Sequence, residues 1–349
     1  NAYGGYSAQS GTAVTGNSLD TGTYTVIMAV GGYSYVRDDN AGSSVTSGKA
    51  DNNALTIGGL VSYAYGGYSC ANGDTAATSG EASHNKVTMG PGGSADCIYG
   101  GRSWTVGPTA KSSAVNENTV TITAGTVGRV YGGSSEAGDS SRIGDTKTTA
   151  GTADKNTVTL SGTASVTNTV YGGYSFAGRA TAGATAASAS GNTVELSGTG
   201  SIGAAKGGIY GGYSYAANPV GSANAGAASK NTVTIRGSKT IKGAVYGGYS
   251  YAYGSSATAG EASDNVINLY DSPDLSAAVL YGGVAQAKLY DGTITTGTAT
   301  GNTLNIYTSG LTAMNIANFQ NINFYLPATI TSGATVLTLT GSNSTNITG

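Results

Sequence analysis

Acidic side chains are the first residues in this sequence that could do chemistry. Ten candidates are Asp38, Asp39, Glu81, Glu136, Asp139, Asp145, Glu261, Asp264, Asp271 and Asp274. A glycosidase or lyase needs two carboxylates within about 5 to 10 Å of each other. The candidates fall in segments that we expect to be loops, and they do not recur at one position of successive repeats. The sequence therefore predicts solvated charges, and we expect no enzyme activity.

The single histidine and the two cysteines are the next candidates. His84 would have to serve in any Ser-His-Asp triad, but it stands beside Asn85 at an expected loop end, which favours a surface position. Cys70 and Cys97 fall seven positions apart along aligned repeats, which is about 23 Å on a straight strand and too far for a disulfide. A tight corner between them would allow the bond, so both states remain open.

Metal ligands and phosphate loops have little support. No group of Cys and His has the spacing of a zinc site, and no calcium-binding Gly-Gly-x-Gly-x-Asp nonapeptide is present. A calcium ion would have to use Asp38, Asp39 and Asn40. The glycine-rich motifs are not followed by a helix or by a placed Lys, as a phosphate loop would be. We predict no metal and no cofactor.

Tyrosine is the most distinctive residue type, with 24 Tyr against 3 Phe and 1 Trp. Its apolar ring and polar tip suit a half-exposed surface. The candidate binding residues are the second tyrosines of a Tyr-Gly-Gly-Tyr-Ser motif: Tyr6, Tyr33, Tyr68, Tyr174, Tyr213 and Tyr249. Two interpretations stay open, because such rings could stack to hold repeats together or could form a strip that binds glycans or another protein.

The motif is one half of a repeat that occurs nine times. Its first glycines are Gly4, Gly31, Gly66, Gly100, Gly132, Gly172, Gly211, Gly247 and Gly282. The other half is Asn followed by an alternating strand such as Asn-Thr-Val-Thr-Ile, and it also occurs nine times. Its asparagines are Asn17, Asn53, Asn85, Asn118, Asn156, Asn192, Asn231, Asn265 and Asn302. The two halves alternate strictly along the chain.

Both halves predict β-strands. In Asn-Thr-Val-Thr-Ile the period of two puts Val and Ile on one face and Thr on the other. The Asn could bond its own backbone or stack on the next Asn as a ladder. In the other half, strict alternation puts Val170 and Tyr174 on one face and Tyr171 on the other. A bulge at Gly-Gly would change that alternation.

Stacking of the repeats is the way to bury their apolar faces, since one unit cannot do so alone. We predict an all-β solenoid of about nine coils of 32–40 residues, with one coil per repeat; two smaller coils per repeat is the alternative. The repeats cover residues 1–310. Residues 311–349 carry two of the three Phe and are predicted to be a distinct C-terminal cap.

Charge and composition restrict the kinds of partner that we expect for this chain. The net charge of −2 gives no electrostatic support for nucleic-acid binding. No run of eighteen apolar residues predicts a membrane-spanning helix, and no signal peptide is visible. The chain opens inside a repeat at Tyr3-Gly4-Gly5, so we expect an uncapped first coil that could associate with another molecule.

These repeats resemble the passenger domain of bacterial type V autotransporters. The resemblance covers the Tyr-Gly-Gly-Tyr-Ser and Asn-Thr-Val units over about residues 1–308 and the segment from Asn318 to Pro327. It implies a right-handed parallel β-helix on the outer surface of a Gram-negative cell, or secreted from it, with adhesion or aggregation as its role. Partners would be glycans or surface proteins of a host or another bacterium. The alternatives are a head-to-tail filament subunit and a β-helix that binds or processes polysaccharide.

Overall fold

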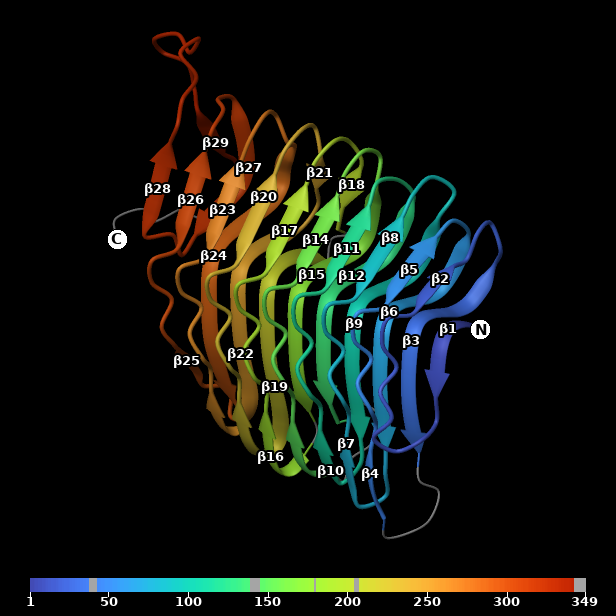
Figure 1. Ribbon diagram of the computed structural model, residues 1–349. Helices are drawn as coiled ribbons and strands as arrows, with labels where there is room; N and C mark the ends of the chain where they lie inside the picture. The colour runs from blue at the N-terminus through green and yellow to red at the C-terminus, as the bar shows by residue number, and fades with distance from the viewer. Residues whose placement is uncertain (38–42, 139–144, 179, 204–206, 342–349) are drawn as a thin grey trace.

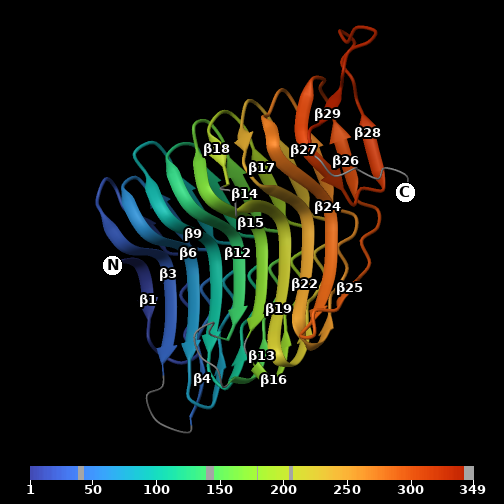
Figure 2. The same cartoon turned by 180° about the vertical axis from the view of Figure 1, so that it is seen from behind.

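The computed structural model describes residues 1–37, 43–138, 145–178, 180–203 and 207–341. This part of the chain contains only strands, turns and loops, without a helix. It forms a parallel β-solenoid of about eight turns, close to the nine predicted. Successive coils lie side by side from the first strand at one end to the last strands at the other, and both faces of the stack are visible in Figures 1 and 2.

Each coil contributes strands to two sheets. The Asn-Thr-Val segments form a ten-stranded parallel sheet, here called the Asn-Thr-Val sheet. Its strands are β2 (Ser18–Asp20), β5 (Ala54–Ile57), β8 (Lys86–Met89), β11 (Thr119–Ile122), β14 (Thr157–Leu160), β17 (Thr193–Leu196), β20 (Thr232–Ile235), β23 (Val266–Leu269), β26 (Thr303–Ile306) and β28 (Asn321–Phe324).

The Gly-Gly segments form the long strands of a larger sheet, here called the Gly-Gly sheet, in which neighbouring long strands are parallel. The long strands are β1 (Ala2–Ser7), β3 (Val26–Arg37), β6 (Leu60–Asn72), β9 (Ser94–Val106), β12 (Thr126–Ala137), β15 (Ser165–Gly178), β19 (Gly208–Asn224), β22 (Ala244–Thr258), β24 (Leu275–Leu289) and β27 (Leu311–Ala317). The short strands of this sheet are β4 (Ser44–Thr46), β7 (Ala76–Thr78), β10 (Thr109–Lys111), β13 (Asp145–Thr149), β16 (Ala180–Thr185), β18 (Ser201–Ile202), β21 (Thr240–Ile241), β25 (Ile294–Thr296) and β29 (Leu337–Leu339).

The strand register gives one coil per repeat. Gly173 of β15 pairs with Gly133 of β12 on one side and with Gly212 of β19 on the other. In the Asn-Thr-Val sheet, Val158 pairs with Val120 and with Val194. Each motif residue therefore lies beside its own counterpart one repeat away, which excludes the alternative of two coils per repeat.

The core is a thin column of aliphatic side chains between the two sheets. Val158 and Leu160 of β14 are fully buried, as the period of two predicts, and they share one cluster with Val166 and Val170 of β15. The outward-facing Thr157 remains partly exposed. β-branched and leucine side chains fill this narrow interior because each contacts its counterpart in the coils before and after it.

The predicted alternation around Gly-Gly is wrong. Val170 points into the core, but Tyr171 and Tyr174 both lie on the outer face, with ring centroids 5.2 Å apart. The reason is that both intervening glycines face inward: a Cβ on Gly172 or on Gly173 would collide with the side chain of Asn192. The strict alternation therefore breaks at the glycine pair, and two tyrosines per repeat lie on the outer face, while neighbouring strands stay in register there, with Tyr171 opposite Tyr210 and Gly173 opposite Gly212.

The same contact explains why the two halves of the repeat occur together. Asn192 begins the Asn-Thr-Val half of its coil and lies against the glycine pair of the Gly-Gly half. The backbone and the asparagine approach so closely that any side chain at the pair would be excluded. Gly-Gly and Asn are therefore the two sides of one contact across the interior of the coil.

Candidate binding face and the polar ladders beneath it

The outer face of the Gly-Gly sheet carries three parallel columns of side chains, one residue of each per coil. The first column is Tyr3, Val30, Tyr65, Tyr99, Tyr131, Tyr171, Tyr210, Tyr246 and Tyr281. The second is Tyr6, Tyr33, Tyr68, Arg102, Ser134, Tyr174, Tyr213, Tyr249 and Val284. The third is Tyr35, Cys70, Trp104, Glu136, Phe176, Tyr215, Tyr251 and Gln286. Together they form what we call the aromatic face.

The first column is a continuous stack of rings from Tyr65 to Tyr281. Successive centroids lie 4.5–5.1 Å apart, and the ring planes are within 16° of parallel. This is about the 4.7–4.9 Å spacing of neighbouring strands, so the backbone pairing itself imposes the stack. Tyr65, Tyr99 and Tyr131 are buried in this stack, whereas Tyr171, Tyr210, Tyr246 and Tyr281 remain partly exposed.

The second column contains all six tyrosines predicted as binding residues. Tyr6 is 53% exposed and Tyr68 only 6%, whereas Tyr33, Tyr174, Tyr213 and Tyr249 are half-buried. Their rings contact the first column; for example, Tyr213 stacks on Tyr210 at 5.1 Å. The two interpretations from sequence are therefore compatible, since these rings pack between coils and still reach the surface. That they bind a ligand stays a prediction.

The second column has Arg102 and Ser134 in place of tyrosine in two successive coils, and Arg102 forms an ion pair there. Arg102 donates from Nε and Nη2 to the two carboxylate oxygens of Glu136, at 3.1 and 2.8 Å. Its guanidinium lies over the rings of Tyr99 at 5.0 Å and Trp104 at 5.3 Å. Glu136 was predicted to be a solvated loop charge, and this is wrong: it lies in β12 with a side chain only 15% exposed. Planar Arg replaces a ring here without breaking the packing.

Burial keeps these phenols neutral even at alkaline pH. It raises the pKa of Tyr68, Tyr174 and Tyr213 well above the ordinary value for tyrosine. At the more open end of the column it raises the pKa of Tyr249 to about 12. The tyrosine columns are thus a surface of uncharged hydroxyl groups and ring edges, with Arg102 and Glu136 as a paired charge within it.

The serine of each motif ties neighbouring coils together inside the solenoid. Ser69 is fully buried; its hydroxyl donates to the carbonyl oxygen of Gly48 in the preceding coil and accepts from the N–H of Gly80 in its own coil, both at 2.8 Å. Equivalent serines such as Ser250 repeat the contact. The motif residue therefore satisfies loop backbone groups that would otherwise be buried without partners.

The repeat asparagines form a buried ladder along the whole stack. The backbone N–H of each Asn donates to the side-chain oxygen of the Asn one coil further on, at 2.8–3.0 Å, and its Nδ2 donates to the same oxygen at 3.0–3.2 Å. Gln320 takes the place of the next asparagine and accepts from Asn302. Of the two arrangements considered from sequence, the Asn ladder forms along the stack, and Asn17 and Asn118 also bond their own backbone two residues earlier.

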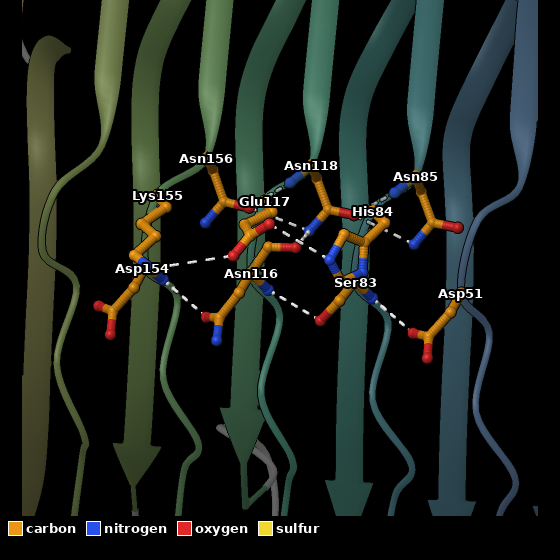
Figure 3. Close-up of polar contacts among 10 residues, drawn as sticks. All are labelled: Asp51, Ser83, His84, Asn85, Asn116, Glu117, Asn118, Asp154, Lys155 and Asn156. Carbon is orange, nitrogen blue, oxygen red and sulfur yellow. Dashed lines mark hydrogen bonds and ion pairs between the residues drawn. The ribbon is translucent and has the colours of Figure 1, made fainter.

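A second ladder runs in the opposite direction two residues before the first. Ser83 donates its N–H back to the carboxylate of Asp51, Asn116 to Ser83, and Asp154 to Asn116, at 2.7–3.0 Å (Figure 3). Burial raises the pKa of the Asp51 carboxyl, and the bond from Ser83 opposes that shift. The hydrogen bonds of the two ladders run in opposite directions along the stack. Each coil is therefore bonded at this corner both to the coil before it and to the coil after it.

Between the ladders, one residue per coil has a left-handed backbone. Its φ is 56–59° at Asn52, His84, Glu117, Lys155, Lys230 and Asp264. Three of these side chains form an exposed row in which Glu117 lies 3.3 Å from Nε2 of His84 and 3.9 Å from Nζ of Lys155 (Figure 3). His84 is thus at the surface, as predicted, and pairs with a carboxylate of the next coil.

Three of the other candidate carboxylates each have a partner of their own. Glu81 pairs with Lys49 at 2.6 Å, Asp271 accepts from the N–H of Gly237, and Asp274 accepts from Ser276. Asp38, Asp39, Asn40 and Asp139 lie outside the described residues. Cys70 and Cys97 are buried free thiols, because Cys70 lies opposite Trp104 and Cys97 opposite Tyr63 on neighbouring strands. Within the described ranges, no three His, Cys, Asp or Glu gather as a metal site.

Two structural features were missed from sequence. The third aromatic column was not identified, although an aromatic residue directly after the motif Ser, as at Phe176 and Tyr251, was its signal. Lys239 was also missed. It is fully buried, and its Nζ donates to the carbonyl oxygens of Ala164 and Thr199 from two earlier coils. Burial lowers the pKa of Lys239 to about 8.

Comparison with known proteins leaves the chain without an assigned family. A scan against models of known protein families gives no match. A search of the curated proteins gives no match either. No helix in the part of the chain that the structure describes is long and apolar enough to cross a membrane. Function must therefore be argued from the solenoid and its aromatic face.

Proposed function

We propose that this chain is an extracellular structural β-solenoid displayed on, or secreted from, a Gram-negative cell, and that it mediates adhesion or aggregation through the aromatic face. The observation that carries the proposal is the face itself. Partly exposed rings lie on this face of β1 and β3 and again from β15 to β24, whereas typical surfaces scatter their aromatic side chains singly. Extended aromatic surfaces of this kind are typical of protein and glycan interfaces.

Electrostatics supports the same proposal. The charged pair within the columns, Arg102 and Glu136, is neutralised internally, and the tyrosines stay protonated. A partner therefore meets ring edges and hydroxyl groups without having to desolvate an isolated charge. The resemblance of the repeats to autotransporter passenger domains supports the cellular location that we propose.

A matched pair of surface variants tests the proposal. Beads coated with the chain are mixed with each other and with fixed mammalian cells, and clusters and bound beads are counted. Tyr251→Lys places a charge in the third column, where Tyr251 is half-exposed. Since burying an unpaired charge in an interface costs several kcal/mol, we expect clustering or cell binding to fall about tenfold or more.

The control places the same charge on the opposite sheet. Thr157→Lys lies on the outer face of the Asn-Thr-Val sheet and should leave both readouts unchanged. Far-ultraviolet circular dichroism and thermal melting check that both variants keep the fold. Equal losses in the two variants, or binding that Tyr251→Lys does not reduce, would refute the aromatic face as the adhesive surface.

A further inference from the structure

The tyrosines of four adjacent coils form a compact group that the adhesive role does not require. This tyrosine block consists of Tyr171, Tyr174, Tyr210, Tyr213, Tyr215, Tyr246, Tyr249, Tyr251 and Tyr281. All nine side chains are partly exposed, so water and small solutes reach them. Each ring in the block has another ring of the block within 6.1 Å.

The closest pairs join different coils. Tyr210 stacks on Tyr246 at 4.8 Å and 10°, and Tyr246 stacks on Tyr281 at 4.8 Å and 8°. In the second column, Tyr213 stacks on Tyr249 at 5.0 Å and 17°. Nearly parallel rings at this separation hold the ring carbons beside each hydroxyl of one phenol next to those of its neighbour.

We propose that the tyrosine block is an oxidative modification site, at which hydrogen peroxide acting through a peroxidase joins stacked tyrosines of successive coils by dityrosine bonds. Each of two tyrosines loses one electron and its phenolic proton to give a phenoxyl radical. The two radicals form one carbon–carbon bond between ring positions beside the hydroxyls, and the hydrogens on those carbons move to the two oxygens. One hydrogen peroxide is reduced to two waters, which balances the two electrons and two protons removed.

The register determines which bonds can form. Two radicals held in one stack react as an intramolecular pair, whose effective concentration far exceeds that of separate molecules in dilute solution. Each bond would join residues one repeat apart, such as Tyr210 and Tyr246, and so would fasten one coil to the next. A solenoid whose coils contact only their neighbours gains most from such links, because unwinding from an end must break each in turn.

The other tyrosines provide internal comparisons. Tyr24 and Tyr290 are 77% and 69% exposed, more than any ring of the block, and within the described residues neither makes a ring–ring contact. Cys70 and Cys97 lie in the aromatic cluster of the earlier coils, where a thiol would compete for the oxidant. If stacking decides which tyrosines couple, the links form within the tyrosine block, whereas if exposure decides, they form at Tyr24 and Tyr290. The block is also a group of stacked tyrosines that has neither cysteine beside it.

Peptide mapping after oxidation tests the proposal. The whole chain, dilute, is treated with horseradish peroxidase and hydrogen peroxide, and the digest is searched by mass spectrometry for peptide pairs that have lost two hydrogens. We expect Tyr210–Tyr246, Tyr246–Tyr281 and Tyr213–Tyr249 links within single molecules. Tyr246→Phe should abolish the first two links and keep the third, and Tyr249→Phe should do the reverse.

Each substitution keeps a ring in place, as Phe176 does in the third column, so the fold should survive. Tyr290→Phe is the control and should leave the pattern unchanged. The proposal would be overturned if the links joined Tyr24 or Tyr290 of separate molecules, if block tyrosines gained oxygen without linking, or if Tyr246→Phe left the pattern intact. None of these results bears on the adhesion assay, which uses unoxidised protein.

Discussion

Replacing Asn156 by Ala is the most direct test of the buried ladder. Asn156 takes part in six hydrogen bonds. Its side chain donates from Nδ2 to the Oδ1 of Asn192 and to the carbonyl oxygen of Val115, and its Oδ1 accepts from the N–H and Nδ2 of Asn118. Its backbone N–H donates to the Oδ1 of Asn192, and its carbonyl oxygen accepts from the N–H of Thr193. Alanine keeps only the two backbone bonds, to Asn192 and from Thr193. It leaves the buried N–H of Asn118 without its acceptor.

The cost follows from those losses. An orphaned buried N–H costs about 1–3 kcal/mol, and each further lost bond about 0.5–1.5 kcal/mol. The Nδ2 of Asn118 keeps its bond to Asn116, which limits the damage. We therefore expect a loss of about 3–5 kcal/mol of local stability, equivalent to a fall of about a hundred- to several-thousand-fold in protection.

Hydrogen exchange at the amide of Asn118 measures this loss where it occurs. A local readout is needed because a stack of repeats can open in parts, so that a single global free energy of unfolding is poorly defined. Thr157→Ala, on the outer face of the same coil, is the control and should change protection little. A fall of less than about tenfold in Asn156→Ala, or an equal fall in the control, would refute the ladder as a stabilising element.

Three further predictions concern pH and glycine. Tyrosines such as Tyr68 and Tyr99 stay neutral in the fold but ionise near pH 10 when unfolded, so stability should fall above pH 10, by about 1.4 kcal/mol per pH unit for each buried ring, as measured by denaturation at graded pH. The pKa of Lys239 is lowered to about 8 in the fold, so the unfolded state holds the proton more tightly and the free energy of unfolding should rise by about 1–3 kcal/mol between pH 8 and 10. In Lys239→Met that rise should vanish, and a rise that persists would contradict the assignment. Gly173→Ala should cost more than about 2 kcal/mol in the melting analysis, because its Cβ meets a backbone carbonyl and Asn192, whereas Gly183→Ala, with only the Ser222 hydroxyl nearby, should cost less than about 1 kcal/mol.

The sequence by itself determined the strands and their stacking. The alternation of Thr and Val in segments such as Thr157–Leu160 predicts which side is buried, because a strand has a period of two whatever surrounds it. The recurrence of Gly-Gly and Asn at matched intervals predicts coils that pair with themselves one repeat away. The alternation is a property of near neighbours in the chain, and the repetition is visible in the order of the residues, so the sequence suffices for both.

Only the tertiary structure decided which side chains of different strands and coils contact one another. The outward position of Tyr171 depends on Asn192 lying against the glycine pair about twenty residues earlier, and the pairing of Arg102 with Glu136 depends on the register of β9 with β12. The separation of Cys70 from Cys97 depends on that same stacking register. In each case the decisive contact joins residues of different strands or coils, and strand periodicity, which reports only on near neighbours, carries no information about it.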